Sequence, residues 1–340
     1  MQVTAPVRVC DCGGWTDTWF AGHGAVLHVA VQPGVEVTVV SRPADTHGPA
    51  VTVGLANFGE TYTFDPASLP GRHRLLEAAV AEWPPVAGEA LDISVRSDMP
   101  PGASTGTSAA VAVALVKALA AIRGRQLTAP EAARLAHHLE TERLGLQSGI
   151  QDQIAAAYGG INFVEMAAYP EAEITRVAIE EPVRVALEER LVLIYLGRAH
   201  RSSDVHDAVI RSLEQGGHAA RALEDLRRAA GLARDGLVNG DLPAFGRAMT
   251  FNTEAQARLN PALVGAEAHA IGAFAVDRGA WGWKVNGAGG DGGSVTLLLG
   301  AAPQETRAAT IALVGSRLPG ARLVPIRLAA EGATTGPPVV

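Results

Sequence analysis

The segment at residues 100–110, Pro-Pro-Gly-Ala-Ser-Thr-Gly-Thr-Ser-Ala-Ala, restricts the fold of this chain more than any other. It follows a β-branched run at residues 91–95 and enters an apolar run at residues 106–121, so we predict a strand, a glycine-rich turn and a helix in succession. Glycines let the backbone approach an anion, consecutive N–H groups form a concave nest, and a helix N-terminus adds partial positive charge. The pattern therefore favours a phosphate-binding loop over an ordinary capped helix after a turn.

The composition provides for a large core and argues against two classes of partner. The chain has 340 residues, of which 48% are hydrophobic and 19% charged, and this length is typical of about two domains. Its net charge of −7 argues against a nucleic acid or an anionic membrane as partner. We find no apolar run of the roughly 18 residues that a membrane-spanning helix needs. The first residues lack the basic and apolar regions of a signal peptide.

The two cysteines, Cys10 and Cys12, are too few for a disulfide framework. They lie two positions apart on a predicted strand, where a bridge between them is geometrically poor. We therefore expect reduced thiols and a cytoplasmic protein.

Predicted strands and helices alternate irregularly along the chain, which indicates the α+β class. We predict strands at residues 3–9, 25–31, 35–41, 51–53, 60–64, 91–95, 160–165, 191–195, 282–285, 294–299 and 321–327, with a turn at 32–34. We predict helices at residues 72–83, 106–121, 204–213, 218–237, 243–259, 263–277 and 303–317, and one that starts at Thr128 with a capping box to Glu131. A boundary within residues 175–189 predicts domains at 1–180 and 181–330, followed by a loose tail at 331–340.

A second glycine-rich segment lies near the C-terminus, at residues 284–293, with the sequence Lys-Val-Asn-Gly-Ala-Gly-Gly-Asp-Gly-Gly. Glycines at this density cost ordering entropy and leave a groove without side chains. We interpret Gly287, Gly289 and Gly290 as a second backbone wall that closes on a phosphate or a sugar. A flexible surface loop is the alternative.

Residues 8–17, Arg-Val-Cys-Asp-Cys-Gly-Gly-Trp-Thr-Asp, predict a strand that ends in a Gly-Gly turn and presents Trp15, Thr16 and Asp17. A carboxylate beside an aromatic ring can bind a sugar through hydrogen bonds to hydroxyls and through stacking. Asp17 could equally cap the next element with its own side chain.

Two carboxylates, Glu140 and Asp152, flank a glycine-containing turn between two predicted helices. Such a pair could place a metal ligand and a proton acceptor on opposite sides of a transferred phosphoryl group. The alternative is a solvated helix end followed by a capping aspartate.

Taken together, these segments resemble the GHMP kinases, the superfamily named for galactokinase, homoserine kinase, mevalonate kinase and phosphomevalonate kinase. The pattern Pro-x-Gly-x-x-x-Gly-x-Ser-Ala-Ala matches their ATP-binding motif. This chain has Ser104-Thr105-Gly106-Thr107-Ser108 where the usual form is Gly-Leu-Gly-Ser-Ser, and both serine positions keep a hydroxyl. The resemblance covers nearly the whole chain. It implies ATP and Mg²⁺ as cofactors and two α+β domains, the second ferredoxin-like, with ATP and sugar between them.

Within this superfamily the chain resembles the sugar-1-kinases. Arg8 and Asp17 have the separation of the arginine and the sugar-binding aspartate in galactokinases, and Gly-Gly-Trp-Thr-Asp-Thr is closer to L-fucokinases and to D-glycero-D-manno-heptose 7-phosphate kinases. Residues 149–153, Gly-Ile-Gln-Asp-Gln, match those two groups as well. A chain of 340 residues has the size of the heptose enzymes, so we rank heptose 7-phosphate first and L-fucose or another anomeric sugar second. A non-catalytic sugar and ATP sensor, or a kinase of a non-sugar alcohol, are the rival functions.

The resemblance also implies roles for individual residues. Asp152 would be the base, Arg8 would lie beside it and the γ-phosphate, and Ser108 and Glu140 would hold Mg²⁺. The ATP phosphates would be bound by Pro101, Gly102, Ala103, Ser104, Thr105, Gly106, Thr107 and Ser108. The sugar would be bound by Gly14, Trp15, Thr16, Asp17, Gly287, Gly289 and Gly290.

A sugar that already carries a phosphate needs a site for that anion. Residues 197–203, Gly-Arg-Ala-His-Arg-Ser-Ser, follow a predicted strand, and Arg198 and Arg201 are the candidates on this segment. A basic loop on the surface is the alternative. A homodimer is compatible with the sequence, which says nothing more about assembly.

Overall fold

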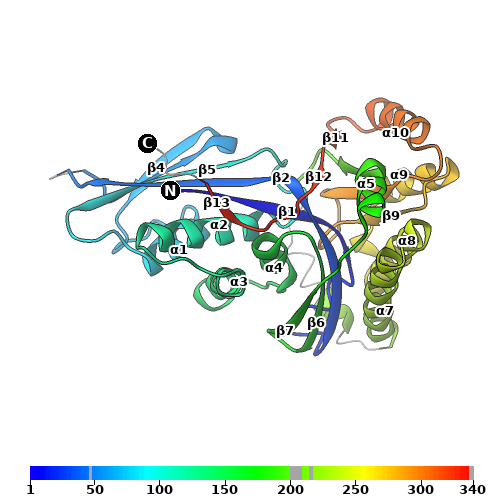
Figure 1. The fold of residues 1–340 in the computed structure, drawn as a ribbon, viewed down its shortest axis with the longest axis horizontal. Helices are drawn as coiled ribbons and strands as arrows, with labels where there is room; N and C mark the ends of the chain where they lie inside the picture. The colour runs from blue at the N-terminus through cyan, green and yellow to red at the C-terminus, as the bar shows by residue number, and fades with distance from the viewer. Residues whose placement is uncertain (46–47, 200–208, 214–216, 337–340) are drawn as a thin grey trace.

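A computed structural model describes residues 1–45, 48–199, 209–213 and 217–336 (Figure 1). Within these residues the chain forms a nine-stranded sheet and a four-stranded sheet, each covered by helices. The predicted α+β class is confirmed. None of the helices described there is long and apolar enough to cross a membrane.

The larger sheet is built around one long strand, β2 (Gly24–Pro43). One edge of β2 pairs with β1 (Gln2–Cys12), and the other edge pairs with β6 (Ile161–Ala168) and then with β5 (Glu89–Ser97). Three further strands extend the sheet: β3 (Val51–Leu55), β4 (Glu60–Phe64) and β7 (Glu171–Arg176). The valines that alternate along β1 and β2 are buried and form the centre of the main core.

Four helices lie on one face of this sheet: α1 (Arg74–Glu82), α2 (Thr107–Ile122), α3 (Ala129–His138) and α4 (Gln151–Tyr158) (Figure 1). The central helix is α2, which packs on β1 and β2 and is apolar around most of its circumference, as a buried helix requires. Helix α3 begins with the predicted capping box between Thr128 and Glu131. These helices bring the N-termini of α2 and α4 to the same end of the sheet.

The predicted turn at residues 32–34 is wrong, because β2 continues through it as one strand of 20 residues. Strand β1 pairs with both halves of β2, and its register shifts between Ala5 and Val7. At Gly34 a Cβ atom would lie 1.9 Å from the carbonyl oxygen of Ala5, so glycine permits the close approach there. Proline and glycine here mark a bulge in a continuous strand, a pattern that resembles a turn in sequence.

The smaller sheet contains β8 (Leu191–Tyr195), β9 (Gly282–Val285), β10 (Ser294–Leu298) and β11 (Arg322–Val324). All its neighbours are antiparallel and the spatial order is β11-β8-β10-β9, which is the ferredoxin-like arrangement that we expected. Helices α9 (Ala266–Asp277) and α10 (Pro303–Arg317) pack with it in a separate core.

Two long helices join the sheets. Helix α7 (His218–Val238) packs on β2, and α8 (Leu242–Leu259) packs on α7 and β9. Helix α5 (Glu181–Arg190) and strand β7 were not predicted from the sequence. The helix predicted at 204–213 falls largely on residues outside those that the structure describes.

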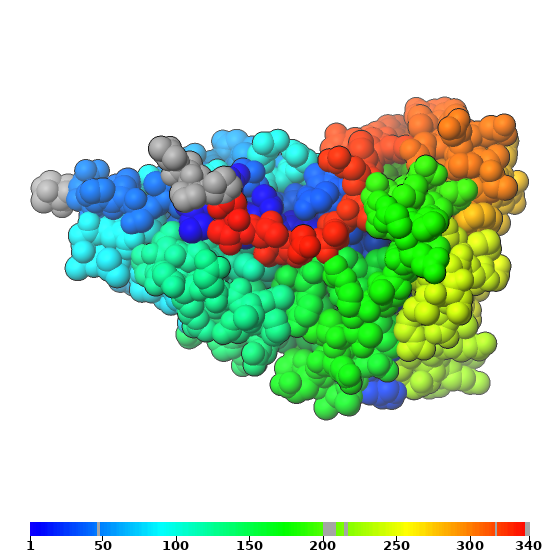
Figure 2. All heavy atoms as spheres, viewed as in Figure 1, coloured from blue at the N-terminus to red at the C-terminus, as the bar shows by residue number. Residues whose placement is uncertain are grey.

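The C-terminal segment returns to the first sheet and is not a loose tail up to residue 336. Strand β12 (Arg327–Leu328) pairs with β2, and β13 (Thr334–Thr335) pairs with β1. Figure 2 shows this red segment running along the surface from the orange helix α10 toward the blue N-terminal strands. A division at residue 180 remains our proposal for the domains, and residues 327–335 join the first domain and not the second.

Candidate active site

The loop before α2 has the backbone geometry of an anion nest. Gly102, Ser104 and Gly106 all have positive φ, at 71°, 58° and 72°. Such alternation turns successive N–H groups toward one side, next to the N-terminus of a 16-residue helix. Pro101 is exposed and does not line the cavity described below, whereas the remaining predicted loop residues do.

The second glycine-rich segment lies directly against this loop. At Gly287 a Cβ atom would lie 2.8 Å from the carbonyl oxygen of Ser104 and 3.2 Å from Nη2 of Arg8, so only glycine fits. Gly289 and Gly290 face elsewhere: the N–H of Gly290 donates to the carbonyl of Leu263 at 2.8 Å. Of the three glycines predicted for the second wall, Gly287 lines the cavity together with Ala288, whereas Gly289 and Gly290 do not.

One cavity of about 670 Å³ opens between the two glycine-rich segments. It is lined by Arg8, Asp11, Trp15, Asp17, Thr18, Leu75, residues 102–109, Glu140, residues 145–149, Gln151, Asp152, Gly287 and Ala288. Five segments far apart in sequence thus meet at one site, which holds the carboxylates predicted for metal and proton chemistry.

Arg8 and Asp152 form a bidentate ion pair at this site. Nε of Arg8 lies 2.8 Å from Oδ1 of Asp152, and Nη2 lies 3.2 Å from Oδ2. Burial alone would lower the pKa of Arg8, but the Asp152 and Asp11 carboxylates outweigh it and the pKa is raised. Nη1 of Arg8 also donates to the carbonyl of Ser104, so the arginine links the phosphate loop to Asp152.

Glu140 lies in a π-helical turn, η2 (Leu139–Arg143), and its side chain is buried. Oε2 accepts hydrogen bonds from Ser148 and Gln153, both at 2.7 Å, whereas Oε1 is buried without a partner. Burial raises the pKa of Glu140 to about 7, with a further contribution from the Asp152 charge. The solvated helix end that was the alternative for Glu140 is therefore wrong.

These residues fit a magnesium ion. An orphaned carboxylate oxygen with a raised pKa is the acceptor that a divalent cation would satisfy, and Ser108 lines the same cavity at the start of α2. Among the residues that the structure describes, no group of three or more His, Cys, Asp or Glu side chains is placed so that it could hold a metal ion by itself. A cation here would therefore depend on phosphate oxygens and water for its remaining ligands.

Asp17 is buried and ties residues 13–17, the loop that follows β1, to α4. Its Oδ2 accepts the backbone N–H groups of Ile150 at 3.0 Å and Gln151 at 3.1 Å, so it caps α4 and not the element that follows it in sequence. Burial raises its pKa to about 6 despite these hydrogen bonds, with Asp152 adding to the rise. Asp17 and Trp15 both line the cavity.

Two other residues of this loop shape it without lining the cavity. The Thr16 hydroxyl donates to the carbonyls of Gly13 at 2.7 Å and Ala25 at 3.1 Å. At Gly14 a Cβ atom would lie 2.9 Å from the Asp11 carboxylate. Neither lies in the position that we predicted for a sugar contact.

The predicted anion site on residues 197–203 is not assembled in the described part of the chain. Arg198 pairs with Glu267 and Asp291, each at 2.7 Å, and it does not line the cavity. Arg201 lies outside the described residues.

Several cavity residues were not predicted from the sequence, and two of them have buried polar side chains, Asp11 and Gln151. Asp11 is a fully buried carboxylate on β1, and its signal was a charged residue inside an apolar strand. Gln151 is 6% exposed, and its Oε1 is buried without a partner beside Asp17. Its signal was its position next to Asp152.

Residues 73–160 match the family model for the GHMP kinases N terminal domain, which includes the phosphate loop, Glu140 and Asp152. This segment of the chain is thus similar to the GHMP kinases, and the chain has the two-domain fold of the solved structure described below.

Two relatives resemble the chain in sequence. The D-glycero-alpha-D-manno-heptose 7-phosphate kinase of Campylobacter jejuni is 27% identical over 58% of this chain and 58% of that protein. The bifunctional fucokinase/GDP-fucose pyrophosphorylase of Arabidopsis thaliana is 25% identical over 87% of this chain and 30% of that protein. The matches thus span less than two thirds of either relative.

A solved structure supports the fold. A D-glycero-D-manno-heptose 1-phosphate kinase from Bacteriodes thetaiotaomicron superposes with a TM-score of 0.73. The superposition covers 98% of this chain and 97% of that one, at 19% identity.

Proposed function

We propose that this chain is an ATP-dependent kinase that phosphorylates the anomeric hydroxyl of a sugar. The observation that carries the proposal is the single cavity in which two glycine-rich walls, the Arg8–Asp152 pair and the orphaned oxygen of Glu140 meet. Phosphoryl transfer asks mainly for positioning and charge stabilisation, and this arrangement supplies both.

The phosphate loop would bind the triphosphate through its backbone. Its N–H groups and the N-terminus of α2 favour an anion, and Gly287 closes the opposite side. Ser108 and Glu140 would hold Mg²⁺, which when bound neutralises charge on the phosphate oxygens. Arg8, fixed between Ser104 and Asp152, offsets charge on the transferred group.

Asp152 would accept the proton of the attacking hydroxyl at its carboxylate. Its side chain is 29% exposed and faces the cavity from the first turn of α4. The bidentate contact with Arg8 fixes the direction in which the carboxylate oxygens point.

Asp17 and Gln151 would bind sugar hydroxyls beside Asp152. Both line the cavity, and the buried acceptor of Gln151 needs a donor that a hydroxyl can provide. Trp15 contributes an aromatic side chain to the lining of the cavity.

The first candidate substrate is D-glycero-D-manno-heptose 7-phosphate, supported by the name and the similar sequence of the Campylobacter jejuni relative. The second is an unphosphorylated sugar such as L-fucose. The pairing of Arg198 with two carboxylates favours the second, because a neutralised arginine is a poor site for a phosphate. An ATP substrate and two free, buried cysteines are compatible with a cytoplasmic protein.

The test is ADP release from the purified protein with ATP and Mg²⁺ against a panel of neutral sugars and sugar phosphates. We expect ADP release above the no-sugar background with at least one member of the panel. Turnover of D-glycero-D-manno-heptose 7-phosphate would support the first candidate, and turnover of L-fucose would support the second. Binding of ATP and sugar without turnover of any member would favour the sensor instead.

A further inference from the structure

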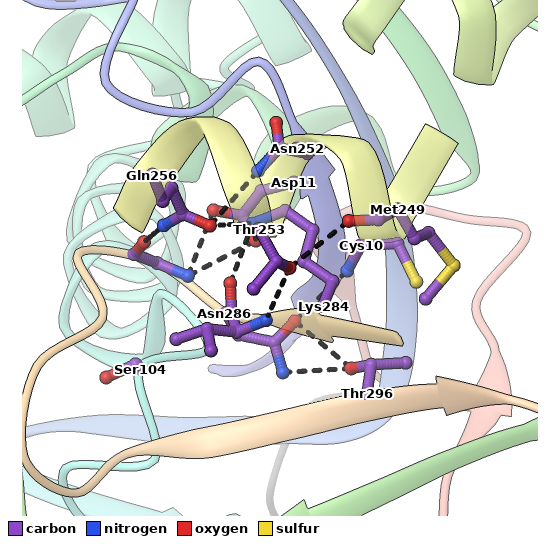
Figure 3. A network of polar contacts seen from close by, with 12 residues as sticks. Cys10, Asp11, Ser104, Met249, Asn252, Thr253, Gln256, Lys284, Asn286 and Thr296 are labelled. Carbon is purple, nitrogen blue, oxygen red and sulfur yellow. Dashed lines mark hydrogen bonds and ion pairs between the residues drawn. The ribbon is translucent and has the colours of Figure 1, made fainter. Parts of the chain in front are cut away.

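A buried ion pair between Asp11 and Lys284 has no role in the chemistry above (Figure 3). Nζ of Lys284 on β9 lies 3.3 Å from Oδ1 of Asp11 on β1, and both side chains have no exposed area. Lys284 also donates to the carbonyl of Val285 at 2.7 Å and to Gln256 on α8 at 3.2 Å. The pair therefore connects the first strand of the large sheet to the small sheet.

The Asp11 carboxylate holds the glycine wall. Both of its oxygens accept from the backbone N–H of Gly287, at 3.2 Å and 3.0 Å. Gly287 in turn lies against the Ser104 carbonyl and the Arg8 guanidinium. One carboxylate thus sets the distance between the second wall and the groups that face the transferred phosphoryl.

Neighbouring side chains make further contacts between β1, the phosphate loop and the small sheet (Figure 3). Oδ1 of Asn286 accepts the backbone N–H of Cys10 at 3.3 Å and the Thr296 hydroxyl at 3.1 Å. The Ser294 hydroxyl donates to the carbonyl of Ala103 in the phosphate loop at 2.5 Å. The strands on both sides of the glycine segment are therefore tied to β1 and to the phosphate loop.

The cost of burying two charges indicates that this pair contributes to the geometry of the site more than to stability. Taking two charges out of water costs several kcal/mol per ion, and apolar residues of similar volume are often as stable or more stable than a buried pair. Burial alone would raise the pKa of Asp11, but the charges of Lys284 and Arg8 outweigh it and the pKa is lowered, so the carboxylate remains an ionised acceptor for Gly287.

We propose that Asp11 and Lys284 are a positioning pair that holds the Gly287 wall in register with Arg8 and the phosphate loop for phosphoryl transfer. The proposal rests on the proposed kinase function. Asp11 acts through Gly287 and Arg8, and Lys284 acts through Asp11. Because a displacement of about 1 Å can cost roughly 100-fold in rate, this pair has a large effect although it touches no substrate.

The test replaces the pair by apolar residues of similar shape, Asp11→Leu with Lys284→Met. We expect kcat at saturating substrates to fall about 100-fold, whereas the melting temperature stays within a few degrees of wild type. The matched control is Glu89→Met with Arg123→Met, which removes an ion pair of 2.8 Å at the far end of α2. The control variant should have a lower melting temperature than the wild type, whereas its kcat should stay within about twofold of the wild-type value.

Amide hydrogen exchange of residues 285–293 gives a readout that needs no substrate. We expect faster exchange in this segment for Asp11→Leu/Lys284→Met and no change for the control. If the wild type phosphorylates no sugar, the proposed function fails. Amide hydrogen exchange still tests whether Asp11 and Lys284 hold residues 285–293 in place. Wild-type kcat, or unchanged exchange of this segment, in the double variant would overturn the positioning role.

A single variant covers the case in which the double variant does not fold. Asp11→Asn keeps the volume and can still accept one hydrogen bond, so we expect a smaller loss of kcat with little change in KM for ATP or sugar. A melting temperature that drops while kcat of the folded fraction stays at the wild-type value would make the pair merely structural and contradict the proposal.

Discussion

Two ion pairs each have one member on β1, Arg8 in the first and Asp11 in the second, and the two pairs lie in opposite environments. Arg8 pairs with Asp152, whose side chain is 29% exposed to the cavity, whereas Asp11 pairs with Lys284 and neither side chain has exposed area. Under the proposed function, the Asp152 carboxylate of the open pair reaches the substrate and exchanges a proton with it. The sealed pair contacts no substrate and acts through the protein groups around it. Burial, more than residue type, therefore separates chemistry from positioning at this site.

The largest effect should come from the open pair. Asp152→Asn keeps the shape but removes the proton acceptor, so we expect kcat to fall by about a thousandfold. ATP affinity, measured by calorimetry, should stay within a few fold because the phosphate loop is untouched. Activity near the wild-type level in this variant would remove Asp152 from the role of base and break the comparison.

Glu140 tests the assignment of a buried carboxylate to the Mg²⁺ site. Glu140→Gln should raise the Mg²⁺ concentration for half-maximal activity by roughly tenfold and lower kcat, because the neutral amide is a poor ligand for a hard cation. A magnesium titration of initial rates measures this. An unchanged Mg²⁺ requirement would contradict the metal assignment.

The same residue predicts a pH effect on stability without Mg²⁺. The pKa of Glu140 is about 7 in the folded chain, above its ordinary 4.5, so between these values the folded state binds more protons than the unfolded state. Its contribution to the free energy of unfolding should therefore decrease as pH rises from about 4.5 to 7. Chemical denaturation across this range should show a weaker decrease in Glu140→Gln, and equal slopes would contradict the assignment.

Asp17 should have a smaller and more selective effect. Asp17→Asn keeps an oxygen for the α4 backbone but lowers its strength as an acceptor, so we expect the sugar KM to rise about tenfold with ATP KM nearly constant. Steady-state kinetics with each substrate varied in turn would check this. A change in ATP KM equal to that in sugar KM would make Asp17 a structural cap only.

The smallest effect should come from a third pair that lies outside the cavity. Arg198→Ala removes a side chain already bonded to Glu267 and Asp291, so we expect kcat/KM for a sugar phosphate to change by less than about twofold. Competition between a sugar phosphate and its unphosphorylated form measures the preference. A loss confined to the phosphorylated substrate would restore Arg198 as an anion site.

The sequence allowed prediction of the parts of this site that depend on local backbone. The phosphate loop and the Thr128 capping box follow from glycine positions and capping spacing. The ferredoxin-like order of the C-terminal strands was expected only from the resemblance to the GHMP kinases. Gly102, Gly106 and Gly287 could be singled out because a positive φ or a close approach of two segments favours glycine at such positions. The roles of these residues in binding stay predictions.

Features that depend on packing between distant parts of the chain could not be predicted from the sequence. Nothing local to residues 32–34 shows that β1 will pair on both sides of a proline, and nothing local to residues 327–335 shows that they return to the first sheet. Asp11 was passed over because its partner lies 273 positions away, at Lys284. Gly289 and Gly290 have the composition of a binding wall, yet they pack on Leu263.

The most direct test of the central claim is ³¹P NMR of the reaction with ATP, Mg²⁺ and the best sugar of the panel. We predict a new phosphate resonance coupled to the anomeric proton, formed by the wild type and not by Asp152→Asn at the same protein concentration. No sugar phosphate from the wild type, or equal formation by both proteins, would contradict the assignment of this cavity to phosphoryl transfer.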